Sequence, residues 1–92
     1  MNMHIHEGYH LRELGDDHLV IGLGEGQKSG SRRVVRLNES AAFLWRAVAK
    51  REFSLDDLAS LLREEYDLAE EAALSDAESI ADAWKKAGLV DG

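Results

Sequence analysis

The chain has 92 residues, no cysteine, no proline and a formal net charge of −7. This length allows one domain with a modest core, and 45% hydrophobic with 32% charged residues indicates a folded globular protein rather than a disordered one. The lack of cysteine excludes disulfides, thiolate chemistry and cysteine-ligated metal centres, and the excess of acids argues against general binding of nucleic acid, which depends on Lys and Arg at phosphates.

The first 37 residues carry three short strand patterns, after a start that we expect to be a flexible tail (residues 1–8). Alternation of apolar and polar residues, or short runs of β-branched residues, predicts strands at 9–14, 18–23 and 32–37. A Gly-Asp-Asp turn separates the first two strands, and a Gly- and Ser-rich connection precedes the third. These segments predict a three-stranded antiparallel meander over residues 9–37.

The third strand is expected to have two unlike faces, because side chains alternate along a strand. Val35 and Leu37 share one face, which is expected to cover the helices. The opposite face carries Arg32, Val34 and Arg36.

Three helices are predicted after the strands. Asn38 is a suitable N-cap for a helix that ends near residue 50. Ser54 and Asp57 have the spacing of a capping-box pair at the start of a second helix. The third helix is expected over residues 70–87, where Gly88 ends it. Apolar side chains at helical spacing predict a common core made of Phe43, Leu44, Trp45, Leu58, Leu62, Ile80 and Trp84.

The order of these elements predicts an α+β fold of the winged helix-turn-helix type, in which a three-stranded antiparallel β-meander is followed by three α-helices. We expect a single domain over residues 1–92, with the helical part at 38–90. Neither half can bury its apolar face alone, so the sheet and the helices are expected to pack on each other.

Charge is unevenly distributed along the chain. Residues 28–51 hold seven basic residues and one acid, whereas residues 64–82 hold eight acids and no base. A winged helix that binds DNA places its last helix in the major groove and needs positive charge there. The acids of the predicted third helix would repel phosphates, so we expect no nucleic-acid partner.

Three other features of the sequence resemble functional sites but lack a part that such a site requires. Residues 22–29 come within one residue of a phosphate-binding loop, but a strand pattern follows them where a helix is required. His4, His6 and His10 are close in sequence, but His4 and His6 lie in the expected tail and no carboxylate is fixed near them, whereas a structural metal site needs about four rigid ligands. No carboxylate has a neighbour that would tune it for acid–base catalysis. We therefore expect no catalytic residue, no metal and no cofactor.

No segment is apolar enough over the roughly 18 residues that a membrane helix requires. The first ten residues lack the basic start and the apolar core of a signal peptide. The sequence therefore predicts a cytoplasmic protein without membrane contact.

From residue 37 onward, the sequence contains an ordered set of residues typical of one family. The set consists of LNESA followed by Leu44 and Trp45, then SLDDL through Leu62 to Tyr66, and finally Asp76, Ile80, Trp84 and GLV. On these residues the chain resembles the PqqD-like family, also called the RiPP recognition element. These small domains are peptide chaperones in the biosynthesis of pyrroloquinoline quinone (PQQ) and of related ribosomally made, modified peptides (RiPPs). Two positions depart from the family pattern: Lys50-Arg51 replaces a common glycine, and Trp84 replaces a usual leucine.

The resemblance implies a non-catalytic adaptor that binds the leader of a precursor peptide. In the family the leader adds as a strand to the third strand of the meander and lies beside the third helix. Carried over to this sequence, the peptide-binding residues are Arg32, Arg33, Val34, Arg36, Asp76, Ile80 and Ala83. Simpler roles stay open, since arginines on an edge strand also guard against aggregation, Ile80 can be a core residue, and Asp76 can be a first-turn acid if the helix starts near Ser75.

The expected partners are a precursor leader peptide and an enzyme that modifies it, either a radical-SAM enzyme or a leader protease. Two other functions remain as alternatives. One is a winged-helix regulator that binds DNA, which the acidic third helix disfavours. The other is a structural module that forms a homodimer through the same edge strand.

Overall fold

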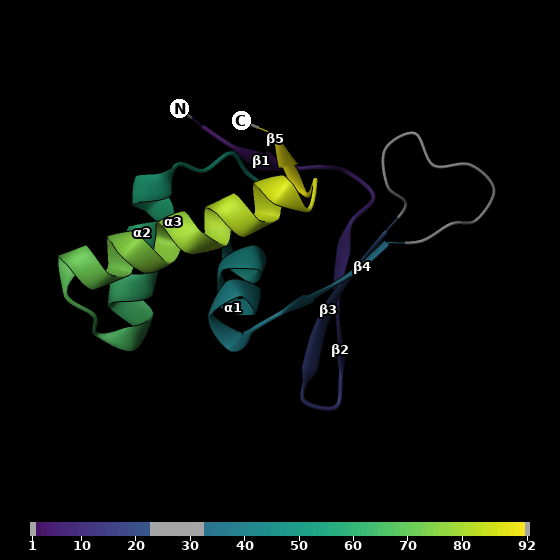
Figure 1. Ribbon diagram of the computed structural model, residues 1–92, viewed down its shortest axis with the longest axis horizontal. Helices are drawn as coiled ribbons and strands as arrows, with labels where there is room; N and C mark the ends of the chain where they lie inside the picture. The colour runs from purple at the N-terminus through teal and green to yellow at the C-terminus, as the bar shows by residue number, and fades with distance from the viewer. Residues whose placement is uncertain (1, 23–32, 92) are drawn as a thin grey trace.

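The computed structural model describes residues 2–22 and 33–91. Five strands and three helices follow one another along these residues (Figure 1). In chain order they are β1 (His4–Ile5), β2 (His10–Leu14), β3 (Asp17–Gly22), β4 (Arg33–Leu37), α1 (Glu39–Val48), α2 (Leu55–Tyr66), α3 (Glu70–Lys86) and β5 (Val90–Asp91). The predicted α+β fold, a three-stranded antiparallel sheet followed by three helices, is confirmed. The expected connection at residues 24–31 and Arg32 lie outside the described residues.

The three-stranded sheet has the order β2-β3-β4, and both pairs are antiparallel. Val20 of the central strand is opposite Val35 of β4, and His18 is opposite Leu37. Val20 and Leu37 are buried and Val35 is half-buried, whereas Val34 and Arg36 are exposed. The two predicted faces of the third strand are confirmed for these residues, and the face with Val35 and Leu37 turns toward the helices.

The first residues of the chain belong to the fold, so the prediction of a flexible tail is wrong for residues 3–6. β1 pairs with β5, with His4 opposite Asp91. Met3 forms an isolated bridge with Phe53, in which the Met3 amide donates to the Phe53 carbonyl at 2.6 Å and the Phe53 amide donates back at 2.9 Å. Met3 and Ile5 are only 4% and 8% exposed. Burial of these two side chains and the backbone bonds attach the N-terminal segment to the helical part.

Local signals in the sequence define the helix ends. Asn38 Oδ1 accepts a hydrogen bond from the amide of Ala41 at 2.8 Å. Ser54 and Asp57 form the reciprocal capping box, with bonds of 3.1 and 2.9 Å, as the sequence predicts. Each bond satisfies an amide that the first helical turn leaves without an intrahelical acceptor.

The core lies where the three helices meet the inner face of the sheet. Leu44, Leu58 and Leu62 are almost completely buried, and Trp84 lies edge-on to Trp45, with ring centroids 5.4 Å apart. The prediction of the core is wrong for Phe43 and Ile80, which are half-buried. Phe43 instead packs on Tyr66 at the margin, with ring centroids 5.9 Å apart.

Candidate functional site

β4 is one of the two outer strands of the three-stranded sheet, and its outer side has no strand partner among residues 2–22 and 33–91. β4 pairs with β3 along one side only, because it is the last strand of the order β2-β3-β4. An edge strand presents a row of amide and carbonyl groups that another extended chain can pair with. Val34, 58% exposed, lies on this strand, so the edge combines unpaired backbone with an accessible apolar side chain.

A cavity of about 230 Å³ lies directly beside this edge, between β4 and α3. Strand alternation turns Val35 and Leu37 toward it, and helical spacing places Ile80, Ala83 and Trp84 on the facing side of α3. Its complete lining is Val35, Arg36, Leu37, Asn38, Ala41, Ser79, Ile80, Ala83 and Trp84. We call this cavity, together with the outer edge of β4, the β4–α3 groove.

The strand residues that were predicted to bind peptide occupy different places. Arg36 lines the β4–α3 groove, and its Nη2 lies 3.6 Å from Asp17 Oδ2 in an exposed pair. Val34 is on the outer face of the sheet and is not part of the groove lining. Arg32 lies outside the described residues, as does the side chain of Arg33, whose backbone belongs to β4.

On the helical side, two of the three predicted residues line the groove. Ile80 is half-buried and Ala83 is exposed there. Asp76 is exposed one turn earlier on α3 and is not part of the lining. The helix begins at Glu70, so Asp76 is not in the first turn, and the simpler explanation that it acts as a first-turn acid is wrong.

Sequence reasoning missed a part of the groove lining. Asn38 and Ala41 belong to it because α1 starts directly after β4, and Ser79 belongs to it because it precedes Ile80 on α3. Trp84 was expected in the core, and it is 1% exposed while also lining the groove. Its indole Nε1–H is buried and has no hydrogen-bond acceptor in the described part of the chain. A buried donor without an acceptor is unfavourable by about 1–3 kcal/mol.

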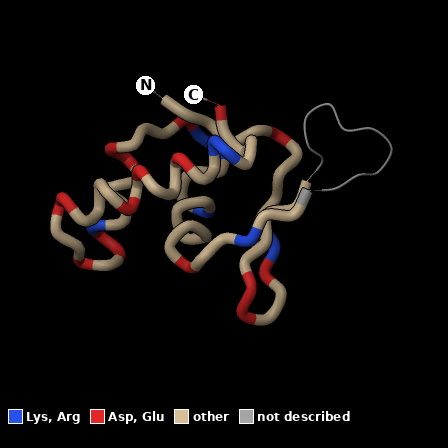
Figure 2. The backbone as a smooth tube through the Cα atoms, viewed as in Figure 1, with Lys and Arg blue, Asp and Glu red and all other residues tan. Residues whose placement is uncertain are grey.

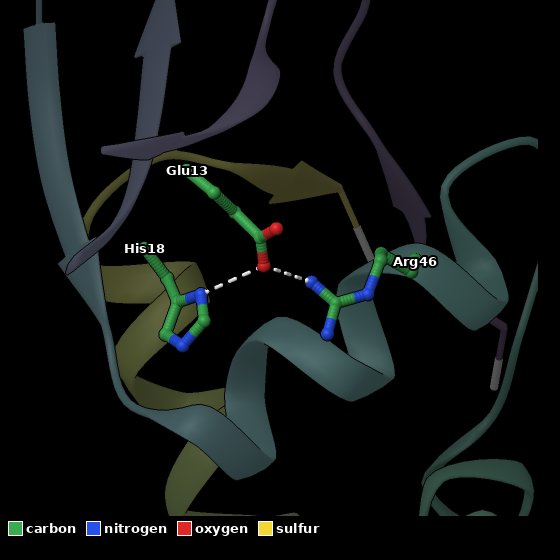
Figure 3. A network of polar contacts seen from close by, with 3 residues as sticks. All are labelled: Glu13, His18 and Arg46. Carbon is green, nitrogen blue, oxygen red and sulfur yellow. Dashed lines mark hydrogen bonds and ion pairs between the residues drawn. The ribbon is translucent and has the colours of Figure 1, made fainter. Parts of the chain in front are cut away.

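A polar network ties the β2–β3 hairpin to α1 (Figure 3). The same carboxylate oxygen of Glu13 accepts from Arg46 Nη1 at 2.8 Å and lies 3.0 Å from Nδ1 of His18. His18 is opposite Leu37 of β4 in the sheet. The network therefore connects α1 to the hairpin next to the strand that forms the groove.

Comparison with protein families gives one match. Residues 27–90 match the family coenzyme PQQ synthesis protein D (PqqD). The chain belongs to the PqqD family. Its match begins ahead of β4 and includes all three helices, whereas β1, β2 and β3 precede it. No curated protein and no solved structure matches the chain, so its likeness to a winged helix stays a prediction.

Members of the PqqD family are non-catalytic accessory proteins, and membership implies a peptide-binding role in the biosynthesis of PQQ and related RiPPs. Within the described ranges, no three His, Asp or Glu side chains are grouped so that they could hold a metal ion. Among those same residues, none of the helices has the length and apolar character to cross a membrane.

Proposed function

We propose that this PqqD-family chain binds the leader of a ribosomally made precursor peptide as a fourth strand of its sheet. The observation that carries the proposal is the coincidence of the unpaired β4 edge with the β4–α3 groove beside it. Addition of a strand satisfies the backbone of both chains, and pockets beside the edge select alternate side chains of the peptide.

The two faces of the bound peptide would contact different kinds of side chain. Side chains that turn inward would contact Ile80, Ala83 and Trp84, a mostly apolar surface. Those that turn outward would lie beside Val34 and Arg36, which are exposed. A leader with apolar residues at alternate positions, and a carboxylate between them, fits this pattern.

The roles of the charged residues follow from their places. Arg36, together with Arg32 and Arg33, would attract leader carboxylates, and Asp76 would accept a Lys or Arg of a leader that continues along α3. The chain would present the bound precursor to a radical-SAM enzyme or a leader protease. It would have no catalytic residue of its own.

The direct test is a titration of isotope-labelled protein with synthetic leaders from short precursor genes near its own gene. Binding should shift the amide signals of β4 and of α3 near Ile80, with a dissociation constant in the micromolar range or below. Absence of shifts in both elements would overturn the proposal. Sedimentation with and without leader tests for a homodimer that forms through the same edge strand. If such a dimer exists, leader binding should dissociate it, because the leader and the second copy compete for the β4 edge.

A variant that fills the groove tests the binding mode. Ala83→Phe places an aromatic ring over an exposed position of the groove lining and should weaken leader binding at least tenfold, which corresponds to about 1.4 kcal/mol. Ala72→Phe is the matched control, since Ala72 is also exposed on α3, about three turns earlier. Equal affinities of the two variants would contradict peptide binding in this groove.

A further inference from the structure

Trp84 combines a place in the lining of the β4–α3 groove with a polar atom that has no partner. It is 1% exposed and lines the groove. In the part of the chain that the structure describes, its indole Nε1–H is the one buried side-chain nitrogen or oxygen without a hydrogen bond. An indole N–H can only donate, so what it lacks is an acceptor. Buried polar groups in native proteins nearly always have a partner, so this exception requires a physical explanation.

On the core side, the neighbours of the indole are aromatic rings. The ring of Trp45 lies edge-on to it at 5.4 Å between centroids, and the ring of Phe53 lies edge-on at 6.1 Å. Both neighbours are buried, at 3% and 0% exposed. An N–H group that points at a ring face makes a contact of second order compared with a hydrogen bond to oxygen. These two rings therefore offer the indole a weak acceptor at best.

On the groove side, the polar residues of the lining do not supply the acceptor either. They are Arg36, Asn38 and Ser79. The guanidinium of Arg36 has no acceptor atom, and Asn38 Oδ1 already accepts from the amide of Ala41 at 2.8 Å. The hydroxyl of Ser79 forms no hydrogen bond with the indole. A peptide bound in the groove could bring the acceptor that these described residues do not provide.

We propose that Trp84 is a specificity-determining residue, which selects leaders with a neutral oxygen acceptor on one inward side chain. A hydroxyl or an amide carbonyl has this chemistry, and the indole Nε1–H would donate to it when the peptide adds to β4. This inference rests on the proposed function and deepens it, since it names the kind of side chain that the groove favours. An apolar side chain in the same place would leave the donor without a partner, which a binding site disfavours.

The surroundings of Trp84 favour a neutral acceptor over a carboxylate. Most of the groove lining is apolar, and a charge that enters such a surface without a partner is strongly disfavoured. The cation of the lining, Arg36, already lies 3.6 Å from Asp17 Oδ2. A hydroxyl has one proton of its own to satisfy, and Ala83 and Ser79 are exposed at the groove, so that proton can remain in contact with water.

Ile80 would regulate the approach from the groove to the indole. It precedes Trp84 by four residues on α3, so the two side chains are neighbours on one face of the helix. Ile80 is half-buried and lines the same groove. Movement of this side chain toward solvent would uncover the buried N–H, and the backbone of α3 could stay in place.

The test compares two capped peptides that differ in one side chain. One is acetyl-Glu-Val-Glu-Thr-Glu-Val-Glu-amide, and the other has valine in place of threonine. The two side chains have nearly the same shape, and burial alone favours valine. A hydrogen bond from the indole favours threonine, so we expect the threonine peptide to bind about fivefold more tightly, the size of one net hydrogen bond.

The indole signals in nuclear magnetic resonance give a second readout that needs no variant. Trp45 and Trp84 are the two tryptophans of the chain. The threonine peptide should move the Nε1–H signal of Trp84 to lower field and slow its hydrogen exchange, whereas the valine peptide should do neither. Trp45 is not part of the groove lining, so its indole signal is the internal control.

A variant without the donor identifies the residue responsible. Trp84→Phe keeps an aromatic ring but removes the N–H, so the preference for threonine should disappear. Trp45→Phe is the matched control, because Trp45 is also buried and lies outside the groove lining; this variant should keep the preference. The ratio of the two affinities is taken within each folded variant, so a change in stability does not affect it. If Trp84→Phe does not fold, the indole signals of the wild type decide.

The outcomes separate this inference from the proposed function. Equal affinities, or tighter binding of the valine peptide, would overturn the role of Trp84, and shifted β4 amides would then leave the proposed function intact. Equal affinities are also the result expected if a ring face satisfies the indole. A preference for threonine that persists in Trp84→Phe would overturn the role of Trp84 as well. A shifted Trp84 indole with unshifted β4 amides would support the contact and overturn strand addition. If neither peptide shifts this indole, the inference is wrong, and the proposed function depends on the leader titration alone.

Discussion

The helices and the three-stranded sheet differ in how completely their apolar side chains are buried. α1, α2 and α3 bury most of theirs, with Leu44, Leu58 and Leu62 at most 1% exposed, although Leu74 of α3 is 37% exposed. Among the side chains of the sheet that the structure describes, Val20 and Leu37 are the buried ones, whereas Leu14 and Val34 are 61% and 58% exposed. Apolar surface stabilises the fold where it is covered, and Val34 is an uncovered apolar side chain on the edge strand β4, to which another strand could add. Stability is thus concentrated in the helices, whereas the peptide binding that we propose involves the edge of the sheet.

The largest effect should come from removing helical core. Leu62 is 1% exposed on α2, so Leu62→Ala should lower the free energy of unfolding by about 2–5 kcal/mol, the range for a buried leucine. Urea unfolding followed by circular dichroism measures it. Under conditions where the variant stays folded, its affinity for a leader should be unchanged. Half-buried Leu61→Ala is the control and should lose less; an equal loss would contradict the distinction between the two positions.

A substitution in the sheet tests whether stability is confined to the helices. Gly22→Ala would bring a Cβ against the carbonyl of Gly8 and the ring of Tyr9. Overpacking of this kind should destabilise the protein by about 1–3 kcal/mol and displace the segment that joins β1 to β2. Thermal unfolding and the amide signals of Tyr9 report the two effects. A variant with wild-type stability would show that the β1–β2 segment can move freely.

The capping box gives a smaller effect within the helical part. Ser54→Ala removes the acceptor for the Asp57 amide and should lower the free energy of unfolding by about 1 kcal/mol. Ser60→Ala, at an exposed position in the same helix, is the matched control and should change it by less than about 0.5 kcal/mol. If both serines behave alike, the cap contributes nothing measurable.

The smallest expected effect concerns the link between the two parts. Glu13→Gln weakens the contacts of Glu13 with Arg46 and His18, and these exposed pairs should contribute about 0.5 kcal/mol at low salt. The difference in the free energy of unfolding between the variant and the wild type should shrink at 1 M salt, because salt screens the interaction between exposed charges. Exposed Glu65→Gln on α2 is the control. A difference that persists at high salt would point to packing rather than charge.

The elements with local signals were predictable from the sequence. Asn38 and Ser54 cap the helices as their spacing predicts, and the alternation in the third strand assigns Val35 and Leu37 to the inner face. These signals act between residues a few positions apart. The family pattern, from LNESA to GLV, lies mostly in the same helices, so the resemblance to the family depends on these local signals as well.

Features that depend on contacts between distant residues were not predictable. β1 and β5 are two residues each, too short to show periodicity, and they pair across almost the whole chain. Ala41 and Ser79 line the β4–α3 groove only because β4 crosses next to α3. Ile80 carries the apolar signal of a core residue but ends half-buried, since that crossing leaves the groove open beside it.

The pairing of β1 with β5 brings the two ends of the chain to one corner of the molecule (Figure 1). A short linker could therefore join them, and new termini could be opened at the exposed turn around Gly15 and Asp16, which is the usual requirement for circular permutation. A purification tag at either end, by contrast, would emerge beside the β1–β5 pair, where His4 lies opposite Asp91. Removal of the tag before any binding measurement would keep this corner of the molecule accessible.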